Sequence, residues 1–547
     1  MTDHEDGAGI AARYHSRTEH RLPNRFARSL GHLEWATQPD PFRCHDGAEL
    51  IELPRREPDE SEGPDWASIR SDSAPAPAPL DSRSFSQLLY DSLAISAWKQ
   101  AGPSKWALRC NPSSGNLHPT EAYFIVDAVR ELIEAPALLH YAPKDHAVEI
   151  RRSLSPSALE ELSCQLPEGA FVLGLSSVAW REAWKYGERA FRYCMHDVGH
   201  AMEGVAIAAR ILGWRARRIE GLTAEQLDRL IALDGSSGPE AERADVLLAI
   251  ETTPTPACGP LRVQLSEQAL DALSPPAEGT PNQLSSRHHD WPILQEVEQA
   301  TRDDGSPQGD VEERGPGTTF EAESPSSPAR VLVRKRRSAV DFDGETTMER
   351  DQLYRMLATL VPALTPSTWT AFPHRPRIHP LVFLHRIDGL DPGLAILVRD
   401  PGAEPLLRQA LSRVEEWSPL PGCPDELPLF RLASGDTRNA GRIAHCHQDI
   451  GADGTLVVSM LTSFDDELAS FGPAAYRHLH WEAGALGHLL YLEAEALSLS
   501  ATGIGCFFDH AIHDLVGLTD GRFRMLYGTA VGRAVLDPRI QTLPAYD

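Results

Sequence analysis

A run of four basic residues in the C-terminal half is the first feature of this sequence that could carry chemistry. Arg334 to Arg337, in "RVLVRKRRSAVDFDG", stand directly before Ser338 and a helix-start pattern. Arginine guanidinium groups match phosphate oxygens geometrically. In a chain with a net charge of -26, such a cluster beside a predicted core indicates a bound anion. The alternative is a solvated basic patch that resembles a nuclear-targeting signal.

A polar loop in the N-terminal half has a counterpart in the C-terminal half that repeats its flanking residues but not its central polar residues. "RCNPSSGNLHPTEAYFIV" begins at Arg109, and "TAFPHRPRIHPLVFLHRI" repeats its proline, its His-Pro pair and its apolar run. The central polar residues differ between the copies: Ser113, Ser114 and Asn116 in the first, and His374, Arg375 and Arg377 in the second. The first copy therefore retains hydroxyl and amide groups that the second has lost.

Two glycines near the C-terminus allow two interpretations. Gly503 and Gly505, in "SATGIGCFFDH", follow a long predicted helix, whereas the first half has "LGWRARRIEGL" there. A helix C-cap with a tight turn is the ordinary interpretation. A backbone that must come close to a flat ligand is the functional one.

A histidine pattern in the first half suggests a metal site but does not match a known motif. His196, His200 and Glu203 share one helical face, which is acceptable geometry for zinc. The spacing is not that of H-E-x-x-H, however. The second half has other residues at these places: Trp481, Ala485 and His488. We expect packing or hydrogen-bonding histidines here and at His445 and His447, and we predict no metal.

Length and composition limit the classes of protein. A chain of 547 residues is too long for one core, so two domains are expected. The acidic balance argues against nucleic-acid binding and against anionic membranes. The eight cysteines are scattered without a C-x-x-C pair, which fits a reducing cytosol. No apolar signal core or bilayer-length run is present, so we expect a cytoplasmic protein.

The chain divides into four parts by composition. Residues 1–80 form an N-terminal extension that ends in a Pro-, Ser- and acid-rich stretch, and residues 263–328 look like a longer disordered linker. The domains themselves are expected at 81–262 and 329–547. The extension has apolar anchors in its first part, which suggests that it packs over the domains, contacts a partner or acts as a lid.

The two domains are related by duplication. "YGERAFRYCMHDVGHAMEGVAIAARILG" and "FGPAAYRHLHWEAGALGHLLYLEAEALS" align without a gap at an offset of 285, placing Gly199 on Gly484 and Asp197 on Glu482. Each helical pattern lies between strand-like apolar runs. We therefore predict an α+β fold of two tandem domains, each with a central antiparallel or mixed sheet flanked by helices. Fusion replaces a homodimer by an intrachain pseudo-dimer, in which a paired site can survive once. Further association of pseudo-dimers is compatible with this prediction.

Three motifs in order resemble the FMN-dependent nitroreductase superfamily. They are "RRS" ahead of a helix, "PSSGN" before His-Pro and a strand, and "GIG" after the long helix. Within that superfamily, "R-x-N-P-S-S-G-N-L-H-P-T-E-A-Y" is similar to the SagB-type branch. Its best-known members are azoline dehydrogenases, which oxidise peptide thiazolines and oxazolines to thiazoles and oxazoles during the biosynthesis of modified ribosomal peptides (RiPPs). The resemblance covers both domains.

The resemblance implies one FMN site shared between the halves. In the family, one subunit's Arg-x-Ser holds the phosphate-ribityl end and the pyrimidine side, its Gly-Ile-Gly backbone lies near the isoalloxazine, and the partner supplies the Pro-Ser-Ser-x-Asn loop. The second half of this chain keeps the first set: Arg336, Arg337, Ser338, Gly503, Ile504 and Gly505, with Arg533 as a further match at the phosphate. The first half keeps the other: Arg109, Pro112, Ser113, Ser114 and Asn116. The mirror site lacks both sets.

The resemblance also implies a catalytic pair. Lys185 and Tyr186, just before the long helix of the first half, resemble the Lys-Tyr pair with which azoline dehydrogenases remove a proton, and the second half has Ser470 and Phe471 there. An exposed helix-start lysine with an interfacial tyrosine is the alternative. The expected reaction is dehydrogenation of a small heterocycle or modified peptide. Hydride passes to flavin N5 and then to oxygen, and a cyclodehydratase is the expected partner.

Two other functions are compatible with the same motifs. One is an NAD(P)H-dependent reductase of nitroaromatics, quinones or enones. The other is a non-catalytic scaffold that retains the flavin fold and delivers peptide to a partner enzyme.

Overall fold

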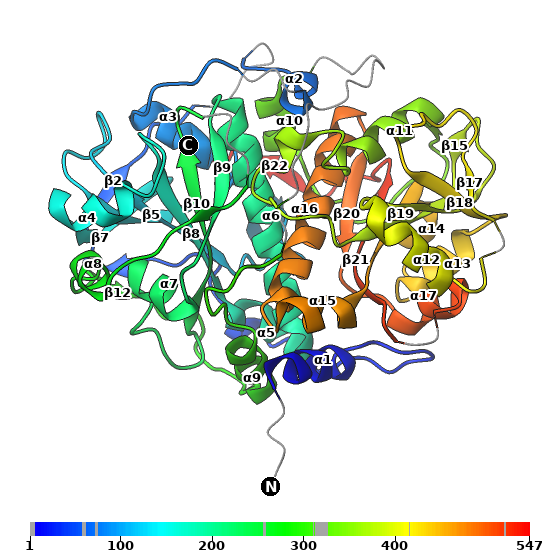
Figure 1. Cartoon of the computed structure of the whole chain (residues 1–547), viewed down its shortest axis with the longest axis horizontal. Coiled ribbons are helices and arrows are strands. Elements are labelled where there is room, and N and C mark those ends of the chain that lie inside the picture. Colours follow the sequence, from blue (N-terminus) through cyan, green and yellow to red (C-terminus); the bar gives the residue numbers. More distant parts are fainter. Residues whose placement is uncertain are drawn as a thin grey trace, which may run out of the picture.

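The two halves of the chain each build a sheet, and the sheets lie on opposite sides of a central pair of helices (Figure 1). The computed structural model describes residues 6–56, 62–71, 75–254, 259–309, 311, 327–414, 416–518 and 521–546. Parts of both predicted linkers, 57–61, 72–74, 310 and 312–326, therefore lie outside the described residues.

The sheet of the first half has eight strands, and all its pairs are antiparallel except β11 (Leu261–Arg262) with β9 (Arg215–Glu220). The central strands β5 (Thr120–Val126) and β8 (Phe171–Val178) are buried at every residue because helices cover both faces. Phe124 and Leu173 pack in the central core, whereas Tyr123 and Val172 pack in a separate cluster on the other face. The order is β11 (Leu261–Arg262), β9 (Arg215–Glu220), β10 (Glu242–Glu251), β8 (Phe171–Val178), β5 (Thr120–Val126), β6 (Ala137–Ala142), β7 (Ala147–Ser153) and β2 (Leu50–Glu52).

The sheet of the second half has seven antiparallel strands and repeats the central part of this order. Its order is β17 (Ser418–Pro419), β18 (Leu429–Ser434), β16 (Gly393–Leu397), β14 (His379–Leu384), β19 (Leu456–Thr462), β21 (Arg524–Gly532) and β20 (Ser500–Ile504). Strands β20, β21, β19, β14 and β16 correspond to β9, β10, β8, β5 and β6. The predicted α+β fold with one flanked sheet per domain is confirmed.

Two 22-residue helices cross at the centre of the molecule, α6 (Ala190–Ile211) and α16 (Ala475–Ala496). They touch at the two glycines that the duplication aligns. A Cβ on Gly199 would lie 2.1 Å from the carbonyl oxygen of Trp481, and one on Gly484 would lie 2.2 Å from that of His196. Only glycine permits this backbone contact, which is nearly symmetrical between the two halves. The crossing therefore marks the approximate two-fold axis.

Shorter helices flank the central pair and cover the outer faces of the sheets (Figure 1). In the first half these are α3 (Ser82–Tyr90), α4 (Pro156–Ser163), α5 (Ala179–Tyr186) and α7 (Ala224–Leu230). In the second half they are α10 (Ala329–Lys335), α11 (Arg350–Thr359), α12 (Glu404–Ala410), α13 (Arg438–Ala444), α14 (Ile450–Asp453), α15 (Phe464–Phe471) and α17 (Asp509–Val516). Short strands β1 (His45–Asp46) with β12 (Thr280–Pro281), and β13 (Met348–Glu349) with β15 (Ile387–Asp388), form two small ladders.

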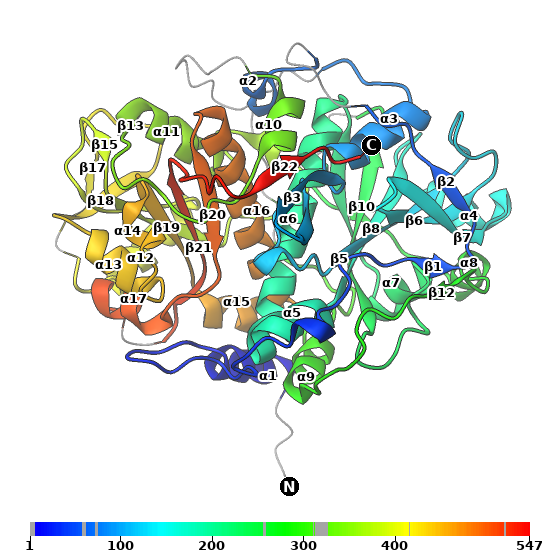
Figure 2. The same cartoon turned by 180° about the vertical axis from the view of Figure 1, so that it is seen from behind.

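The C-terminal tail crosses from the second half to the first (Figure 2). Strand β22 (Gln541–Leu543) pairs with β3 (Ile95–Ala101), which pairs with β4 (Ser104–Arg109). Strand β4 leads directly into the polar loop that begins after Arg109. The exchanged tail thus fixes the loop of one half against the chain of the other.

The predicted extension and linker contain more regular structure than their composition suggests. Helices α1 (Gly7–Arg17) and α2 (Trp66–Arg70) lie in the extension, and α8 (Glu267–Leu273) and α9 (Pro292–Ala300) lie in the linker. Each is anchored by a few buried apolar side chains, such as Trp66, whose indole N–H donates to Glu493 at 2.9 Å. Among the described residues, none of the helices has the length and apolarity to cross a bilayer.

Candidate active site

A cavity of about 910 Å³ lies between the two halves, and most of the predicted site residues line it. The polar loop and the end of α5 approach from the first half. The segment after α10, the end of β20 and the residues that follow β21 approach from the second. A ligand in this cavity would touch both halves of the chain.

The polar loop is held in one conformation by its own hydrogen bonds. Asn116 and His118 both have left-handed backbone angles, φ 59° and 51°, which are uncommon for residues other than glycine. Asn116 Nδ2 donates to Ala107 O at 2.9 Å, its Oδ1 lies 3.0 Å from His118 Nε2, and the His118 amide donates to Ser113 Oγ at 2.8 Å. The loop is therefore a preformed wall of the cavity.

A carboxylate from the central helix clamps the loop. Asp197 on α6 accepts from the Ser114 amide at 3.0 Å and from Ser114 Oγ at 3.2 Å. Charge-assisted bonds of this kind are stronger than neutral ones. The long helix therefore positions the loop directly.

Arg336 is a buried cation in the cavity wall, and one of its guanidinium nitrogens has no partner among the described residues. Its side chain is 4% exposed, its Nε donates to Cys110 O at 2.8 Å, and its Nη2 donates to Arg109 O at 2.9 Å. Its Nη1 has no hydrogen-bond partner among the described residues. Burial lowers the pKa of Arg336. A buried guanidinium with an unused N–H is suited to an anionic ligand.

Arg337 and Ser338 continue this basic wall. Burial, and then the charge of Arg336, lower the pKa of Arg337 to about 10. Ser338 Oγ lies 2.8 Å from the hydroxyl of Tyr491, which also accepts from the Gly503 amide at 2.7 Å. Two cations and a hydroxyl therefore lie together in this wall, and such groups suit a phosphate dianion.

Gly503 lies in β20 and Gly505 lies just beyond it, not at the end of the helix, which ends at Ala496. The C-cap interpretation is therefore wrong. A Cβ on Gly503 would lie 1.9 Å from the Tyr527 hydroxyl, and one on Gly505 would lie 2.1 Å from the ring of Tyr193. Glycine is needed because two tyrosines pack against this backbone within the cavity wall, which Ile504 also lines.

Lys185 and Tyr186 end α5 beside the polar loop. A Cβ on Gly115 would lie 2.6 Å from Tyr186 Oη and 3.1 Å from Lys185 Nζ, so both polar tips reach the loop. Burial, and then the charge of Glu182, raise the pKa of Tyr186 well above its usual value. The phenol therefore keeps its proton at neutral pH and is available as a hydrogen-bond donor.

Three cavity-lining tyrosines were not predicted from the sequence: Tyr193, Tyr491 and Tyr527. Tyr193 donates to Gly505 O at 3.1 Å, and Tyr527 lies 3.2 Å from His200 Nε2. The glycines were the available signal, because each glycine leaves the space that a tyrosine occupies. His200, expected only to pack or to form hydrogen bonds, also lines the cavity.

The remaining predicted residues are placed as follows. Arg109 and Pro112 line the cavity, but Arg109 Nη2 is already bound to Pro41 O at 2.6 Å. Arg533 is not among the lining residues; its Nε donates to Thr346 Oγ1 at 3.0 Å and its side chain is exposed. His196 stacks on Tyr527 with ring centroids 4.3 Å apart. His445 lies buried near Ser459, and His447 packs on Phe508.

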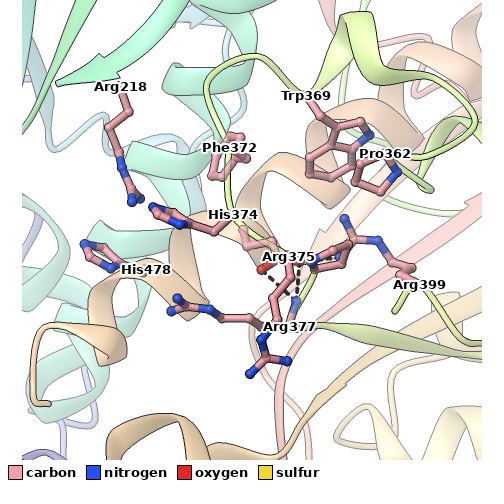
Figure 3. Close-up of a pocket in the computed structure, with 11 residues that line it drawn as sticks. Arg218, Pro362, Trp369, Phe372, His374, Arg375, Arg377, Arg399 and His478 are labelled. Carbon is pink, nitrogen blue, oxygen red and sulfur yellow. Dashed lines mark hydrogen bonds and ion pairs between the residues drawn. The ribbon is translucent and has the colours of Figure 1, made fainter. Parts of the chain in front are cut away.

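The pseudo-symmetric mirror position is filled. Its residual cavity measures about 20 Å³, and arginine and histidine side chains converge on it from both halves (Figure 3). Arg218 Nε and His374 Nε2 both bind Glu220, at 2.9 and 2.7 Å. Arg375 donates to Glu467 at 2.8 Å, and Arg399 pairs with Glu482. At this size the mirror position holds ion pairs in place of a ligand.

The alignment of the two halves shows which residues differ between the open cavity and the mirror position. At the offset of 285 residues, Gly503 and Gly505 correspond to Arg218 and Glu220. Two positions without side chains at the open cavity thus carry charged side chains at the closed one. The second loop contributes His374, Arg375 and Arg377 in place of hydroxyl and amide groups.

Comparisons with known proteins agree with this architecture. Residues 393–533 match the model of the nitroreductase family. A solved structure from Anabaena variabilis ATCC 29413, assigned as a nitroreductase, superposes with a TM-score of 0.70 at 21% identity and covers 97% of this chain and 100% of that chain. This likeness shows that the nitroreductase fold extends over both halves.

A curated relative matches a smaller part. A protein of Methanocaldococcus jannaschii, also assigned to the nitroreductases, is 26% identical over 142 residues. The match spans 25% of this chain and 66% of that protein's length.

Proposed function

We propose that this chain is an FMN-dependent oxidoreductase that dehydrogenates an azoline-like heterocycle in a modified peptide. The observation that carries the proposal is the asymmetry of the pseudo-dimer. The polar loop of one half and the Arg-Arg-Ser and Gly-Ile-Gly segments of the other line the same large cavity. The mirror position lacks both sets and is filled.

The residues present fit FMN. Arg336 offers a buried N–H without a partner, and Arg337 and Ser338 lie beside it, so these three would hold the phosphate end. Arg533, which the resemblance assigns to the phosphate, points elsewhere and is left out of this proposal. The polar loop and the backbone of Gly503 to Gly505 would flank the ring system. When bound, FMN supplies the two-electron acceptor.

The chain itself would handle the proton. Aromatisation of an azoline removes a hydride and a proton, and the proton needs a base within reach. Tyr186 keeps its own proton because its pKa is raised, so it would orient the substrate as a hydrogen-bond donor. Lys185 is the proposed base: it is not among the residues that line the cavity, but its Nζ lies beside the same loop.

An apolar rim supports a peptide-borne substrate. Val340 and Leu536 are 90% and 81% exposed, and Val535 is 49% exposed, yet all three line the cavity mouth. Exposed large apolar side chains grouped at a cavity mark binding surfaces. A heterocycle within a peptide would cover them while its ring enters the cavity. A cyclodehydratase that forms the azoline is the proposed partner.

Flavin stoichiometry tests the site. Released FMN should be one per chain in the wild type. Arg336→Ala should weaken FMN binding about 100-fold, because it removes charge-assisted bonds worth about 3 kcal/mol. The matched control is Arg399→Ala, which breaks a buried ion pair in the mirror position. That variant should lower the unfolding temperature and retain one FMN per chain. Two FMN per chain would contradict the proposal.

Anaerobic reduction tests the reaction. An azoline-containing peptide should bleach the visible flavin absorbance of the holoenzyme, and oxygen should restore it. Lys185→Ala should bind FMN normally and slow bleaching about 100-fold, the usual contribution of a positioned base. Rapid bleaching by NAD(P)H alone would favour a reductase of nitroaromatics, quinones or enones. FMN that neither substrate reduces would favour a scaffold.

A further inference from the structure

Two cysteines from separate segments meet at the wall of the cavity. Cys506 follows Gly505 and lines the cavity, and Cys446 follows α13. Their sulfur atoms lie 2.7 Å apart. Thiols that are not bonded to each other lie farther apart than this, whereas a disulfide needs an approach to about 2.05 Å. The pair therefore needs only a small movement to form a bond.

The backbone around Cys446 is held in an uncommon conformation. Cys446 and His447 both have left-handed angles, φ 56° and 59°. Consecutive non-glycine residues in this region are strained unless their surroundings hold them. Gln448 Nε2 donates to His445 O at 2.9 Å and to Cys506 O at 3.3 Å, which ties this turn to the cavity wall. The turn presents Cys446 to Cys506.

Neighbouring groups favour thiol chemistry at this pair. His20, from the N-terminal extension, places its Nδ1 at 3.4 Å from Cys506 Sγ and 3.7 Å from Cys446 Sγ. Burial lowers the pKa of His20 to about 2, so its ring is a neutral partner for a thiol. Arg189 donates to Gly505 O at 3.0 Å, which brings a fixed cation close to Cys506.

We propose that Cys446 and Cys506 are a redox-active dithiol at the cavity wall, which forms a reversible disulfide by exchange with an organic disulfide of the glutathione class. The Cys506 thiolate attacks one sulfur of the organic disulfide, forms a mixed disulfide and releases one thiolate. Cys446, on losing its proton, attacks Cys506 Sγ and releases the second thiolate. The chain loses two electrons and two protons, and the organic disulfide becomes two thiols.

The electrostatics assign different roles to the two thiols. The Cys446 thiol lowers the pKa of Cys506, burial opposes this effect, and Arg189 adds to it. The same contact with Cys506, together with burial, raises the pKa of Cys446. A thiol with a depressed pKa in an electropositive, partly exposed position is the usual attacking group. Cys506, which lines the cavity, is therefore the attacking thiol, and Cys446 resolves the mixed disulfide.

The geometry fits a disulfide better than a metal. His20, Cys446 and Cys506 are close enough to be considered as ligands. Two thiolates on one tetrahedral zinc, each about 2.3 Å from the metal, lie roughly 3.7 Å apart. The observed sulfur separation is about 1 Å shorter. Among the described residues the group provides three donors, one fewer than a closed structural zinc site uses.

The test uses the full-length protein as purified. Wild-type protein is reduced, freed of reductant and incubated in glutathione buffers of increasing oxidised fraction. Remaining thiols are alkylated in acid, and the digest is analysed by mass spectrometry. We expect a linked peptide pair containing Cys446 and Cys506, lighter by two hydrogen atoms and restored by dithiothreitol.

Single variants separate the two roles. Cys446→Ser should accumulate glutathione on Cys506, because the resolving thiol is missing. Cys506→Ser should leave Cys446 open to alkylation. Cys164→Ser removes an exposed cysteine on α4's C-terminal side and should change neither result. Since the wild-type digest alone decides whether the bond forms, the test survives a variant that fails to fold.

Two outcomes would overturn the inference. One is complete alkylation of both cysteines in wild-type protein at the highest oxidised fraction. The other is stoichiometric zinc that Cys446→Ser and Cys506→Ser release. Neither measurement needs FMN, so the inference and the proposed flavin function can fail separately.

Discussion

The open cavity and the filled mirror position lie at equivalent places between the two halves, related by the approximate two-fold axis, but they differ in volume and in the side chains that line them. Their volumes are about 910 and 20 Å³. The frame is shared: Asp197 on α6 binds the Ser114 amide, and its counterpart Glu482 on α16 binds the Arg377 amide at 3.1 Å. Both loops are therefore fixed by a carboxylate from the central helices. The carboxylate that fixes the loop is therefore present at both positions, although the mirror position has no comparable cavity.

The difference lies in the side chains at equivalent positions of the strand and the loop. At the open cavity the strand carries glycines and the loop carries hydroxyl and amide groups. At the mirror position the same places carry arginine, glutamate and histidine, which pair with one another. In a homodimer both sites would have to change together, whereas a fused chain can change one of them alone. The charged filling contributes to the domain interface, and its removal should affect stability before it affects ligand binding.

The largest effect should come from making the open cavity resemble its mirror. Gly503→Arg with Gly505→Glu introduces the mirror residues, and each Cβ would lie within about 2 Å of a buried tyrosine. Overpacking and buried charge together should weaken FMN binding by about 4 kcal/mol, or 1,000-fold. Flavin released from the purified variant should fall below detection, and circular dichroism should show that the fold remains.

The reverse exchange is the matched control. Arg218→Gly with Glu220→Gly removes two side chains from the mirror position but leaves Arg375, Arg377 and Arg399 in place. The variant should still contain one FMN per chain. A second FMN would mean that the strand residues alone close the mirror position, and it would contradict the role assigned to the loop.

A smaller effect should follow from loosening the shared clamp. Asp197→Asn keeps the side-chain shape but removes the charge that holds the Ser114 amide and hydroxyl. Loss of the charge-assisted component, about 1.5 kcal/mol, should weaken FMN binding about 10-fold. Fluorescence titration of the apoprotein with FMN measures this change.

The equivalent change in the other half should act differently. Glu482→Gln removes the partner of the buried Arg399 and loosens the mirror loop. It should lower the unfolding temperature without changing FMN affinity. Equal losses of FMN affinity in both variants would show that the clamps act on the whole interface and not on one loop.

Sequence periodicity predicted the fold well because, after the duplication, the same pattern of helices and strands occurs twice in the chain. The two long helices align without a gap, and their aligned glycines prove to be the crossing contact. The complementary loss of loop and strand motifs also predicted which segments would line one cavity. The extension and linker were predicted less well, because short helices such as α2 and α9 depend on two or three buried apolar residues, which an average over the composition does not show.

Side-chain direction was the part of the site that the sequence did not reveal. Arg533 was expected at a phosphate, but it points outward to Thr346. Tyr193 and Tyr527 were missed because they enter the cavity from a helix and a strand of different halves. The Cys446–Cys506 pair was missed because its members are 60 residues apart without a motif. These contacts are tertiary, and local patterns carry no information about them.

The two sheets also differ in the charge of their buried histidines. In the first half His140 on β6 lies between Glu149, 2.8 Å from its Nδ1, and Glu121, 3.4 Å from its Nε2. Burial alone would lower the pKa of His140, but the two carboxylates outweigh it and raise the pKa to about 9. In the second half burial lowers the pKa of His379 to about 3. Only the first sheet therefore carries a buried imidazolium at neutral pH.

This contrast predicts a modest pH dependence of stability. Since the folded-state pKa of His140 lies above its ordinary value of 6.5, its contribution is complete below pH 6.5 and is lost as the pH rises through 9. Between pH 7 and pH 8 the free energy of unfolding should fall by about 1 kcal/mol. Urea titrations at the two pH values measure this fall. His140→Gln should flatten it, and His379→Gln should leave it unchanged because that ring is already neutral. An equal fall in wild type and His140→Gln would show that another group titrates in this window.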